Sequence, residues 1–346
     1  MKSSIYLFAL SLLILTSACR EVLIGEPVPN TVINSYELFA QDFEEHYGIF
    51  QVKNVNWPAL VDQYRTPLTA NSNDDGLYDA LTGLITELDD SHLFLYAFSD
   101  PNDPMFFGGG IAGRLNRQNY EDLDLKLVFD KYVSIIDSVS EIIYYGTLAD
   151  NIGYIYLPEI YDEPSFFEQY MPQVIEDLKD TKGIVIDIRD NGGGEDESSK
   201  MIASFFADQR RLYMISRYKI GPGPDEFEEP REWYVAPYAG ERYDKPVVLL
   251  TNRYSVSAAE TFSFAMKTFP QVSQVGDTTT GAFSDVVTRE LPNGWLYGVS
   301  VGDYRNADNI NLESIGIAPD VVIVNTPQDL AAGNDLMLER AIDELR

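Results

Sequence analysis

Residues 183–194 read GIVIDIRDNGGG, an apolar run that ends in a charged, glycine-rich turn. A short, continuous run rich in β-branched residues is typical of a strand buried on both faces of a sheet. Residues 197–207 continue with helical spacing, so the segment predicts a strand, a turn and a helix in succession. The same order recurs where the apolar run 247–250 leads through a polar turn to a helix expected over 258–269. These units predict an α/β fold.

The remaining pattern divides the chain into an α/β region and a helical region before it. Around the two units we expect strands at 152–157 and 321–324, a helix at 166–178, and a closing helix at 329–345. Asn293-Gly294 between the alternating runs 286–291 and 295–301 predicts a hairpin. Upstream, helical spacing predicts helices at 34–48, 56–65 and 74–88, and short strands are expected at 107–111 and 125–129.

We therefore expect five divisions of the chain. They are a signal segment (1–18), a tether (19–32), a small N-terminal helical subdomain (33–95), a short intervening segment containing β-strands (96–150) and a main α/β domain (151–346).

The charge balance excludes one class of function. Among 346 residues, 25 are basic and 55 are acidic, which gives a net charge of −30. A surface this acidic repels nucleic-acid phosphates, so we expect no nucleic-acid partner.

The N-terminus reads as an export signal. The apolar run 5–15 follows Lys2 and is shorter than the roughly 20 residues that span a bilayer, as in the central region of a secretory signal. Small residues then lead to Cys19, the only cysteine of the chain. This arrangement resembles the lipid-attachment signal of bacterial lipoproteins, although Thr16 stands where leucine is usual. The expectation is an envelope protein, on the periplasmic side of a membrane or on the cell surface, held by a lipid anchor at Cys19. The alternative is an ordinary secretory signal with an incidental cysteine.

The glycine-rich turn is a candidate anion site. The backbone N–H groups of Gly192, Gly193 and Gly194 can converge on a phosphate or on a developing oxyanion. The phosphate alternative is the weaker one because three acidic residues follow at 195–197 and no lysine-bearing phosphate loop is present. A flexible turn without function remains open.

A second candidate lies in the turn after the run 247–250. Ser257 and Glu260 form a Ser-x-x-Glu capping box, which explains both residues without any chemistry. A serine between a strand and a helix is also well placed as a nucleophile, because helix N–H groups lie beside it. From these residues alone the cap is the better interpretation.

Four segments in one order decide the matter by resemblance: DIRDNGGG (187–194), SVSAAE (255–260), VGDTTTG (275–281) and GIAPDV (316–321). Together they resemble the motifs of the C-terminal-processing, or tail-specific, serine peptidases. The resemblance implies a crotonase/ClpP-like α/β core, a nucleophile at Ser257, and hydrolysis of peptide bonds in peptide or protein substrates. The segment 93–150 lacks the glycine-rich signature of a PDZ domain, so we expect no complete PDZ domain.

One position departs from that pattern. Typical members of the family use a serine–lysine pair, but Ala282 stands where the lysine is expected, and Lys267 falls in the middle of a predicted helix. The related tricorn-core peptidases use a Ser-His-Ser-Glu tetrad instead. Ser91, His92 and Glu313 fill its other three places.

The resemblance assigns a role to each member of this set. His92 would take and return the proton of Ser257, while Ser91 and Glu313 would orient the imidazole. The N–H groups of Gly192, Gly193, Gly194 and Ala258 would form the oxyanion hole. His46, the other histidine, lies on a polar helical face and reads as a surface residue.

The function expected is therefore a serine-type endopeptidase that needs no metal and no cofactor. The acidic residues near the glycine-rich turn match no calcium loop and read as a solvated helix start. The alternative, from another class, is a catalytically inactive peptide- or lipid-binding lipoprotein on the same fold, which the absent lysine favours.

Overall fold

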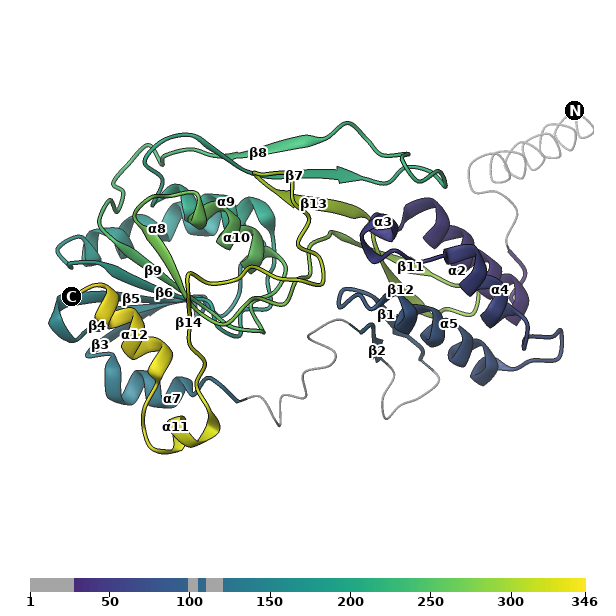
Figure 1. The fold of residues 1–346 in the computed structure, drawn as a ribbon, viewed down its shortest axis with the longest axis horizontal. Helices are drawn as coiled ribbons and strands as arrows, with labels where there is room; N and C mark the ends of the chain where they lie inside the picture. Colours follow the sequence, from purple (N-terminus) through teal and green to yellow (C-terminus); the bar gives the residue numbers. More distant parts are fainter. Residues whose placement is uncertain (1–27, 99–104, 110–120) are drawn as a thin grey trace, which may run out of the picture.

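The computed structural model describes residues 28–98, 105–109 and 121–346, and the predicted signal segment with Cys19 lies outside them. Figure 1 shows two parts side by side, a large one built on a twisted sheet and a smaller one that carries the N-terminal helices. Within the described ranges, no helix is both long and apolar enough to cross a membrane.

The large part is built on a seven-stranded sheet, in the order β14-β10-β9-β6-β5-β4-β3. Five neighbouring strands run parallel, and β4 and β3 complete the sheet in antiparallel fashion. The strands are β3 (Ile135–Val139), β4 (Ile143–Leu148), β5 (Ile152–Tyr156), β6 (Ile184–Asp187), β9 (Val247–Thr251), β10 (Val272–Gly276) and β14 (Val321–Val322). Because β6 and β9 are parallel neighbours, the turns that follow them meet at one edge of the sheet.

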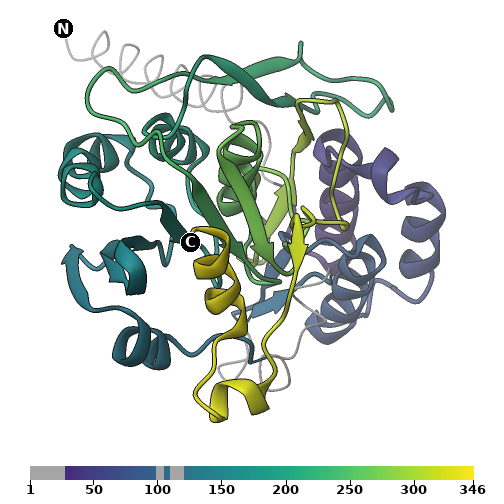
Figure 2. The ribbon, with the colours of Figure 1, turned by 60° about the vertical axis from the view of Figure 1, so that its left-hand side comes forward.

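Helices cover both faces of this sheet, as the continuous apolar runs predict. On one face lie α8 (Pro164–Leu178), α9 (Asp196–Ser204) and α10 (Ala258–Lys267). On the other lie α7 (Leu125–Leu127), the π-helical turn η2 (Val128–Tyr132) and α12 (Leu336–Glu344), with α11 (Pro327–Ala331) at the bottom. Figure 2 shows α12, in yellow, packed in front of the strands. Along β9, Leu249 faces the first helix layer and Val248 the second.

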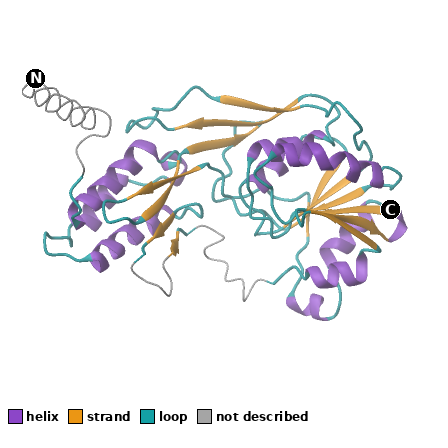
Figure 3. Ribbon diagram, turned by 180° about the vertical axis from the view of Figure 1, so that it is seen from behind, coloured by secondary structure: helices purple, strands orange, loops and turns teal. Residues whose placement is uncertain are grey.

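A three-stranded antiparallel sheet, β13-β7-β8, runs over the first helix layer. Its strands are β7 (Arg211–Tyr218), β8 (Arg231–Val235) and β13 (Gly302–Asn306). Figure 3 shows that this sheet reaches from the large part toward the N-terminal helices.

The smaller part combines segments from both ends of the chain. Its helices are α2 (Val32–His46), α3 (Phe50–Lys53), α4 (Trp57–Arg65) and α5 (Asp74–Leu88). They pack on a four-stranded sheet, β11-β12-β1-β2, made of β11 (Val286–Glu290), β12 (Leu296–Ser300), β1 (Phe94–Tyr96) and β2 (Met105–Phe107). Leu95 pairs with Tyr297, and the Tyr297 ring joins Phe43 and Trp57 in one aromatic cluster.

The sheets therefore cross the divisions drawn from the sequence. The predicted hairpin β11–β12 belongs to the residues 151–346, yet it completes the sheet of the N-terminal part. Conversely, β3 and β4 belong to the intervening segment 96–150 and extend the central sheet. This exchange of strands ties the two parts together, which matters for a site whose expected residues come from both.

Most of the expected elements are present, with three local corrections. The strand expected over 107–111 is not found at 108 and 109, because β2 ends at Phe107, and residues 110 and 111 lie outside the described part of the chain. Residues 125–129 form a helical turn instead of a strand, because the Asp124 side chain accepts a hydrogen bond from the Leu127 N–H and starts a helix. The expected closing helix is split into α11 and α12 by Gly333, whose φ of +81° is incompatible with a continuing helix.

Candidate active site

Ser257 lies in a strained turn between β9 and α10. Its backbone has φ 56° and ψ −120°, a combination that residues with a side chain rarely adopt. Strain of this kind typically costs about 1–3 kcal/mol and is concentrated at functional sites. The side chain is half-buried at the start of α10, next to the backbone N–H groups of the first helical turn. A turn of this shape presents a serine hydroxyl above the end of a parallel strand.

Glu260 does more than cap this helix. Its buried carboxylate accepts hydrogen bonds from the N–H of Ser257 (3.1 Å), the hydroxyl of Thr279 (2.5 Å) and the N–H groups of Gly281 (2.8 Å) and Ala282 (2.9 Å). Burial raises the pKa of Glu260 to about 8, and these four donors act against that rise. Glu260 thus fastens the serine turn to the loop that contains Ala282, the position of the absent lysine.

The glycine-rich turn after β6 packs directly against the serine turn. A Cβ atom on Gly193 would stand 2.8 Å from the Cβ of Ser257 and 3.0 Å from the backbone nitrogen of Ala258. A Cβ atom on Gly194 would stand 1.6 Å from the Ile160 carbonyl oxygen, and both glycines have a positive φ. Glycine is therefore required at 193 and 194 by close packing as well as by backbone conformation.

Asn191 holds the shape of this turn. Its side-chain amide donates to the Leu157 carbonyl (2.8 Å) and accepts from the Gly193 N–H (2.9 Å). The Gly193 N–H predicted for the oxyanion hole is therefore engaged within the turn itself. The turn and Ala258 lie together beside Ser257.

His92 lies in a turn that follows α5, with Ser91 before it. The buried carboxylate of Asp90 shapes the turn, because it accepts from the His92 N–H (2.8 Å) and from the hydroxyl of Tyr47 (3.1 Å). Burial lowers the pKa of His92. The carboxylates of Asp90 and Asp285 act to raise this pKa, and the positive charge of Lys53 acts to lower it further. The imidazole is therefore neutral at pH 7, the state that a general base requires.

The imidazole is not held by the residues expected to orient it. Its Nδ1 atom is buried and has no hydrogen-bond partner among the described residues. This nitrogen therefore makes no hydrogen bond with Ser91, Glu313 or Ser257. An unpartnered buried nitrogen costs about 1–3 kcal/mol, which a substrate-bound rearrangement can recover.

Glu313 makes its contacts with other groups. One carboxylate oxygen accepts from the Phe283 N–H (2.8 Å), and the other lies 2.9 Å from the Lys53 ammonium. Burial raises the pKa of Glu313 to about 7; Asp90 adds to the rise and Lys53 opposes it. His92 and Glu313 share Asp90 and Lys53 as charged neighbours, so both belong to one buried electrostatic cluster.

The structure thus joins the predicted residues in two groups. Ser257, Ala258 and the glycine turn are in direct contact, and His92 and Glu313 share charged neighbours. The segment 281–283 connects the groups, because Glu260 holds Gly281 and Ala282 while Glu313 holds Phe283. Sequence reasoning missed Lys53, Asp90 and Tyr47. Asp90, directly before the Ser-His pair, carried a local signal as a turn-forming residue, whereas Lys53 carried none.

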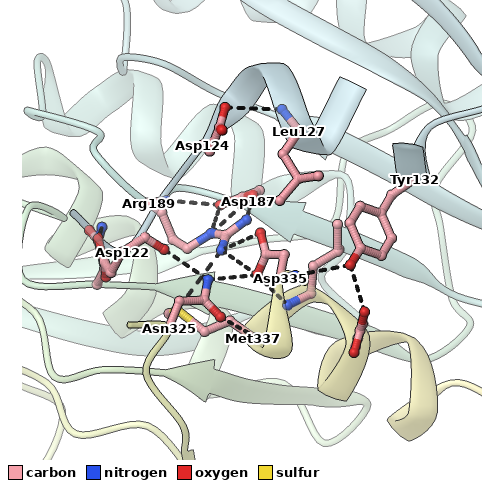
Figure 4. A network of polar contacts seen from close by, with 12 residues as sticks. Asp122, Asp124, Leu127, Tyr132, Asp187, Arg189, Asn325, Asp335 and Met337 are labelled. Carbon is pink, nitrogen blue, oxygen red and sulfur yellow. Dashed lines mark hydrogen bonds and ion pairs between the residues drawn. The ribbon is translucent and has the colours of Figure 1, made fainter. Parts of the chain in front are cut away.

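The Asp-x-Arg portion of the first motif has a structural role. Arg189 is wholly buried between the carboxylates of Asp187 (2.7 Å) and Asp335 (2.9 Å), as Figure 4 shows. Asp335 also caps α12, and Asn325 donates to it (2.8 Å). The guanidinium therefore locks the end of β6, just before the glycine turn, to the C-terminal helix.

His46 lies at the end of α2 and pairs with Asp42 at 2.9 Å, with about a third of its side chain exposed. Within the described ranges, no group of three or more His, Cys, Asp or Glu residues is arranged to hold a metal ion.

Comparison with known proteins agrees with this geometry. The model of peptidase family S41 matches residues 151–323. Tricorn protease of Thermoplasma volcanium is 27% identical over 198 residues, which cover 56% of this chain and 17% of that protein. The carboxy-terminal processing protease CtpA of Bacillus subtilis is 26% identical over 216 residues, 62% of this chain and 42% of that protein. The chain therefore spans less than half the length of these curated relatives.

The fold is also found in solved structures. A crystal structure of a candidate peptidase from Parabacteroides merdae superimposes with a TM-score of 0.80 at 29% identity, over 92% of this chain and 97% of that one. The similarity includes the N-terminal helices as well as the α/β part. With the family model matching half of the chain, the protein belongs to peptidase family S41, the family of serine peptidases that includes the tricorn and C-terminal-processing proteases.

Proposed function

We propose that this protein is a serine-type endopeptidase that cleaves peptides or protein tails through an acyl-enzyme at Ser257, with His92 as the base. One observation carries the proposal: a strained serine turn packs against a glycine turn that leaves no room for a side chain. The core that bears it is of the crotonase/ClpP-like type.

The reaction follows from these positions. The Ser257 hydroxyl attacks the substrate carbonyl carbon while its proton passes to the neutral imidazole of His92. The amine leaves with that proton, and a water molecule then hydrolyses the ester by the reverse transfer. Ser91 and Glu313 orient and stabilise the charged imidazole, which requires the ring to turn from its free-state position.

The oxyanion is held by backbone N–H groups. Ala258 supplies one from the first turn of α10, and the glycine turn supplies another. Because the Gly193 N–H already donates to Asn191, the donors from the turn are Gly192 and Gly194. Each such donor typically contributes about 3 kcal/mol to the stability of the transition state.

Hydrolysis of casein or of a peptide library tests the proposal. Wild-type protein should release new amino termini, and Ser257→Ala should release none while keeping its folded circular-dichroism spectrum. Cleavage that survives in Ser257→Ala would assign the chemistry to another residue.

The second candidate is a binding protein without catalysis. Two observations favour it: Ala282 replaces the family lysine, and Nδ1 of His92 has no partner among the described residues. Peptide binding by wild type and Ser257→Ala alike, with no cleavage by either, would favour this function.

The location follows from the N-terminal segment. We place the protein in the bacterial envelope, anchored by lipid at Cys19 after removal of residues 1–18. Mass spectrometry of the N-terminal peptide tests this, and a free or absent Cys19 in membrane-extracted protein would contradict it.

A further inference from the structure

The Lys53 side chain contacts both the segment leading to His92 and the turn that carries Glu313. It is the last residue of the four-residue helix α3, which Asn54 ends in a left-handed conformation (φ 54°). The Lys53 side chain is only 6% exposed, and that of Glu313 is 1% exposed. A lysine buried to this degree is rare and needs partners for its charge.

The ammonium of Lys53 has three oxygen neighbours. It donates to the carbonyl of Asp89 (2.7 Å) and to the hydroxyl of Ser314 (2.5 Å), and it lies 2.9 Å from the carboxylate of Glu313. Asp89 ends α5, three residues before His92. Ser314 directly follows Glu313 and has a positive φ of 62°. The lysine therefore joins chain segments about 260 residues apart in the sequence.

An ammonium has no lone pair, so Lys53 cannot accept a proton while its charged group faces these three oxygens. Lys53 is thus not a substitute for the family lysine as a base. Its positive charge instead lies near His92 and Glu313. In the proposed reaction His92 acts on Ser257, and Glu313 acts on His92.

We infer that Lys53 is a positioning residue, which clamps the His92 turn against the Glu313 turn. The inference rests on the proposed function, because it assigns His92 and Glu313 to the same reaction. The clamp crosses the boundary between the N-terminal helices and the α/β part, so the active site is completed only when these parts are docked.

The charged surroundings of the two groups give the direction of the effect. Asp90, Asp285 and Lys53 face His92, while Asp90, Lys53 and the hydroxyl of Tyr47 face Glu313. Lys53 is the one positive charge in both sets. Without it, the carboxylates around His92 favour the imidazolium ion, and Glu313 takes up a proton more readily.

The test measures His92 directly. The chain has only two histidines, so His46→Gln leaves a single imidazole signal in the NMR spectrum of histidine-labelled protein. In this background, Lys53→Met should move the midpoint of the His92 titration upward. Lys53→Arg, which keeps the charge, should leave it nearer the original value.

Lys267→Met is the matched control. Lys267 lies on α10, the helix that begins after Ser257, but it pairs with Asp320 at the surface (2.9 Å). Its removal takes away one charge and should leave the His92 titration unchanged. An unchanged His92 midpoint in folded Lys53→Met, or an equal change in Lys267→Met, would overturn the inference.

A kinetic measurement separates this result from the proposed function. The rate at which a fluorophosphonate labels Ser257 should fall at pH 7 in Lys53→Met, because less of the imidazole is then neutral, and should recover as the pH rises. Should Lys53→Met fail to fold, Lys53→Arg and Ser314→Ala carry the test, since a clamp predicts slower labelling in both. Normal labelling in both would overturn the clamp. Absence of labelling in wild type would refute the peptidase proposal, while the His92 titration would still decide the role of Lys53.

Discussion

Gly193 and Ser257 approach so closely that a methyl group on the glycine would stand 2.8 Å from the serine Cβ atom. The two residues come from turns after neighbouring parallel strands, β6 and β9, and they are 64 positions apart in the sequence. Their contact fixes the distance between the nucleophile and the proposed oxyanion donors. The proposed chemistry therefore depends on the absence of a side chain at Gly193 as much as on the side chains that take part in the reaction.

Gly193→Ala should consequently lose most activity. The new methyl group collides with Ser257 and with the Val256 carbonyl oxygen, and the backbone φ of +96° adds strain. We expect a drop in fluorophosphonate labelling of at least about 100-fold, which corresponds to the displacement of one neighbouring oxyanion donor, Gly192 or Gly194, from its position. Gly192→Ala provides the comparison, because its methyl group enters open space and its N–H is retained. Equal losses in both variants would argue against the close contact as the cause.

The strain at Ser257 should be measurable as stability. Glycine adopts φ 56° and ψ −120° far more readily than serine or alanine does. Ser257→Gly should therefore unfold with a free energy about 1 kcal/mol higher than Ser257→Ala, and both should be inactive. Urea denaturation of the two variants provides the measurement. An equal or lower stability of the glycine variant would show that the turn is unstrained.

Arg189 should be essential for folding and not for the reaction itself. Its guanidinium is buried between Asp187 and Asp335, so Arg189→Met leaves two carboxylates without their cation. Loss of one partner of a buried ion pair typically costs about 3–5 kcal/mol. The urea midpoint should fall accordingly. The surface variant Arg346→Met, which removes an exposed partner of Asp150, should change it little.

Stability should decrease as the pH rises from mildly acidic to alkaline values. Burial raises the pKa of Glu260 to about 8 and those of Asp122, Asp196 and Glu313 to about 7. Between pH 4.5 and these values the folded protein holds protons that the unfolded chain releases. The free energy of unfolding therefore falls as the pH increases through that window. His92, with its lowered pKa, has the opposite effect, and only below about pH 6.5.

Urea midpoints at pH 5.5 and pH 8 check this direction. Asp196→Asn should reduce the difference between them, because the amide keeps the hydrogen bond from Thr261 (2.6 Å) and no longer titrates. A higher midpoint at pH 8 than at pH 5.5 would contradict the expectation.

The sequence predicts well what is local. The apolar runs before Gly192 and before Ser257 give the buried strands β6 and β9, and the Asn-Gly turn gives the hairpin β11–β12. The helix starts at Trp57 and Asp74 also agree, since Asn56 and Asn73 accept hydrogen bonds from the first helical turn. Helix capping and hydrophobic periodicity involve only a few neighbouring residues, so they can be recognised in a single sequence.

What the sequence does not predict is the pairing of distant segments. Nothing near residue 297 indicates that its strand pairs with Leu95 and not with the central sheet. No local signal marks Lys53, because its partners Asp89 and Ser314 lie 36 and 261 residues further along the chain. The expected Ser91, His92 and Glu313 contacts were inferred from resemblance alone. The free-state geometry instead pairs Glu313 with Lys53 and leaves Nδ1 of His92 without a partner in the described part of the chain.

The most direct test of the account is the rate of fluorophosphonate labelling in wild type, Ser257→Ala and His92→Ala at pH 7. The account predicts one labelled site in wild type, no labelling in Ser257→Ala, and labelling at least about 100-fold slower in His92→Ala, the usual contribution of a general base. Labelling of Ser257 at the wild-type rate in folded His92→Ala would contradict the assignment of His92 as the base.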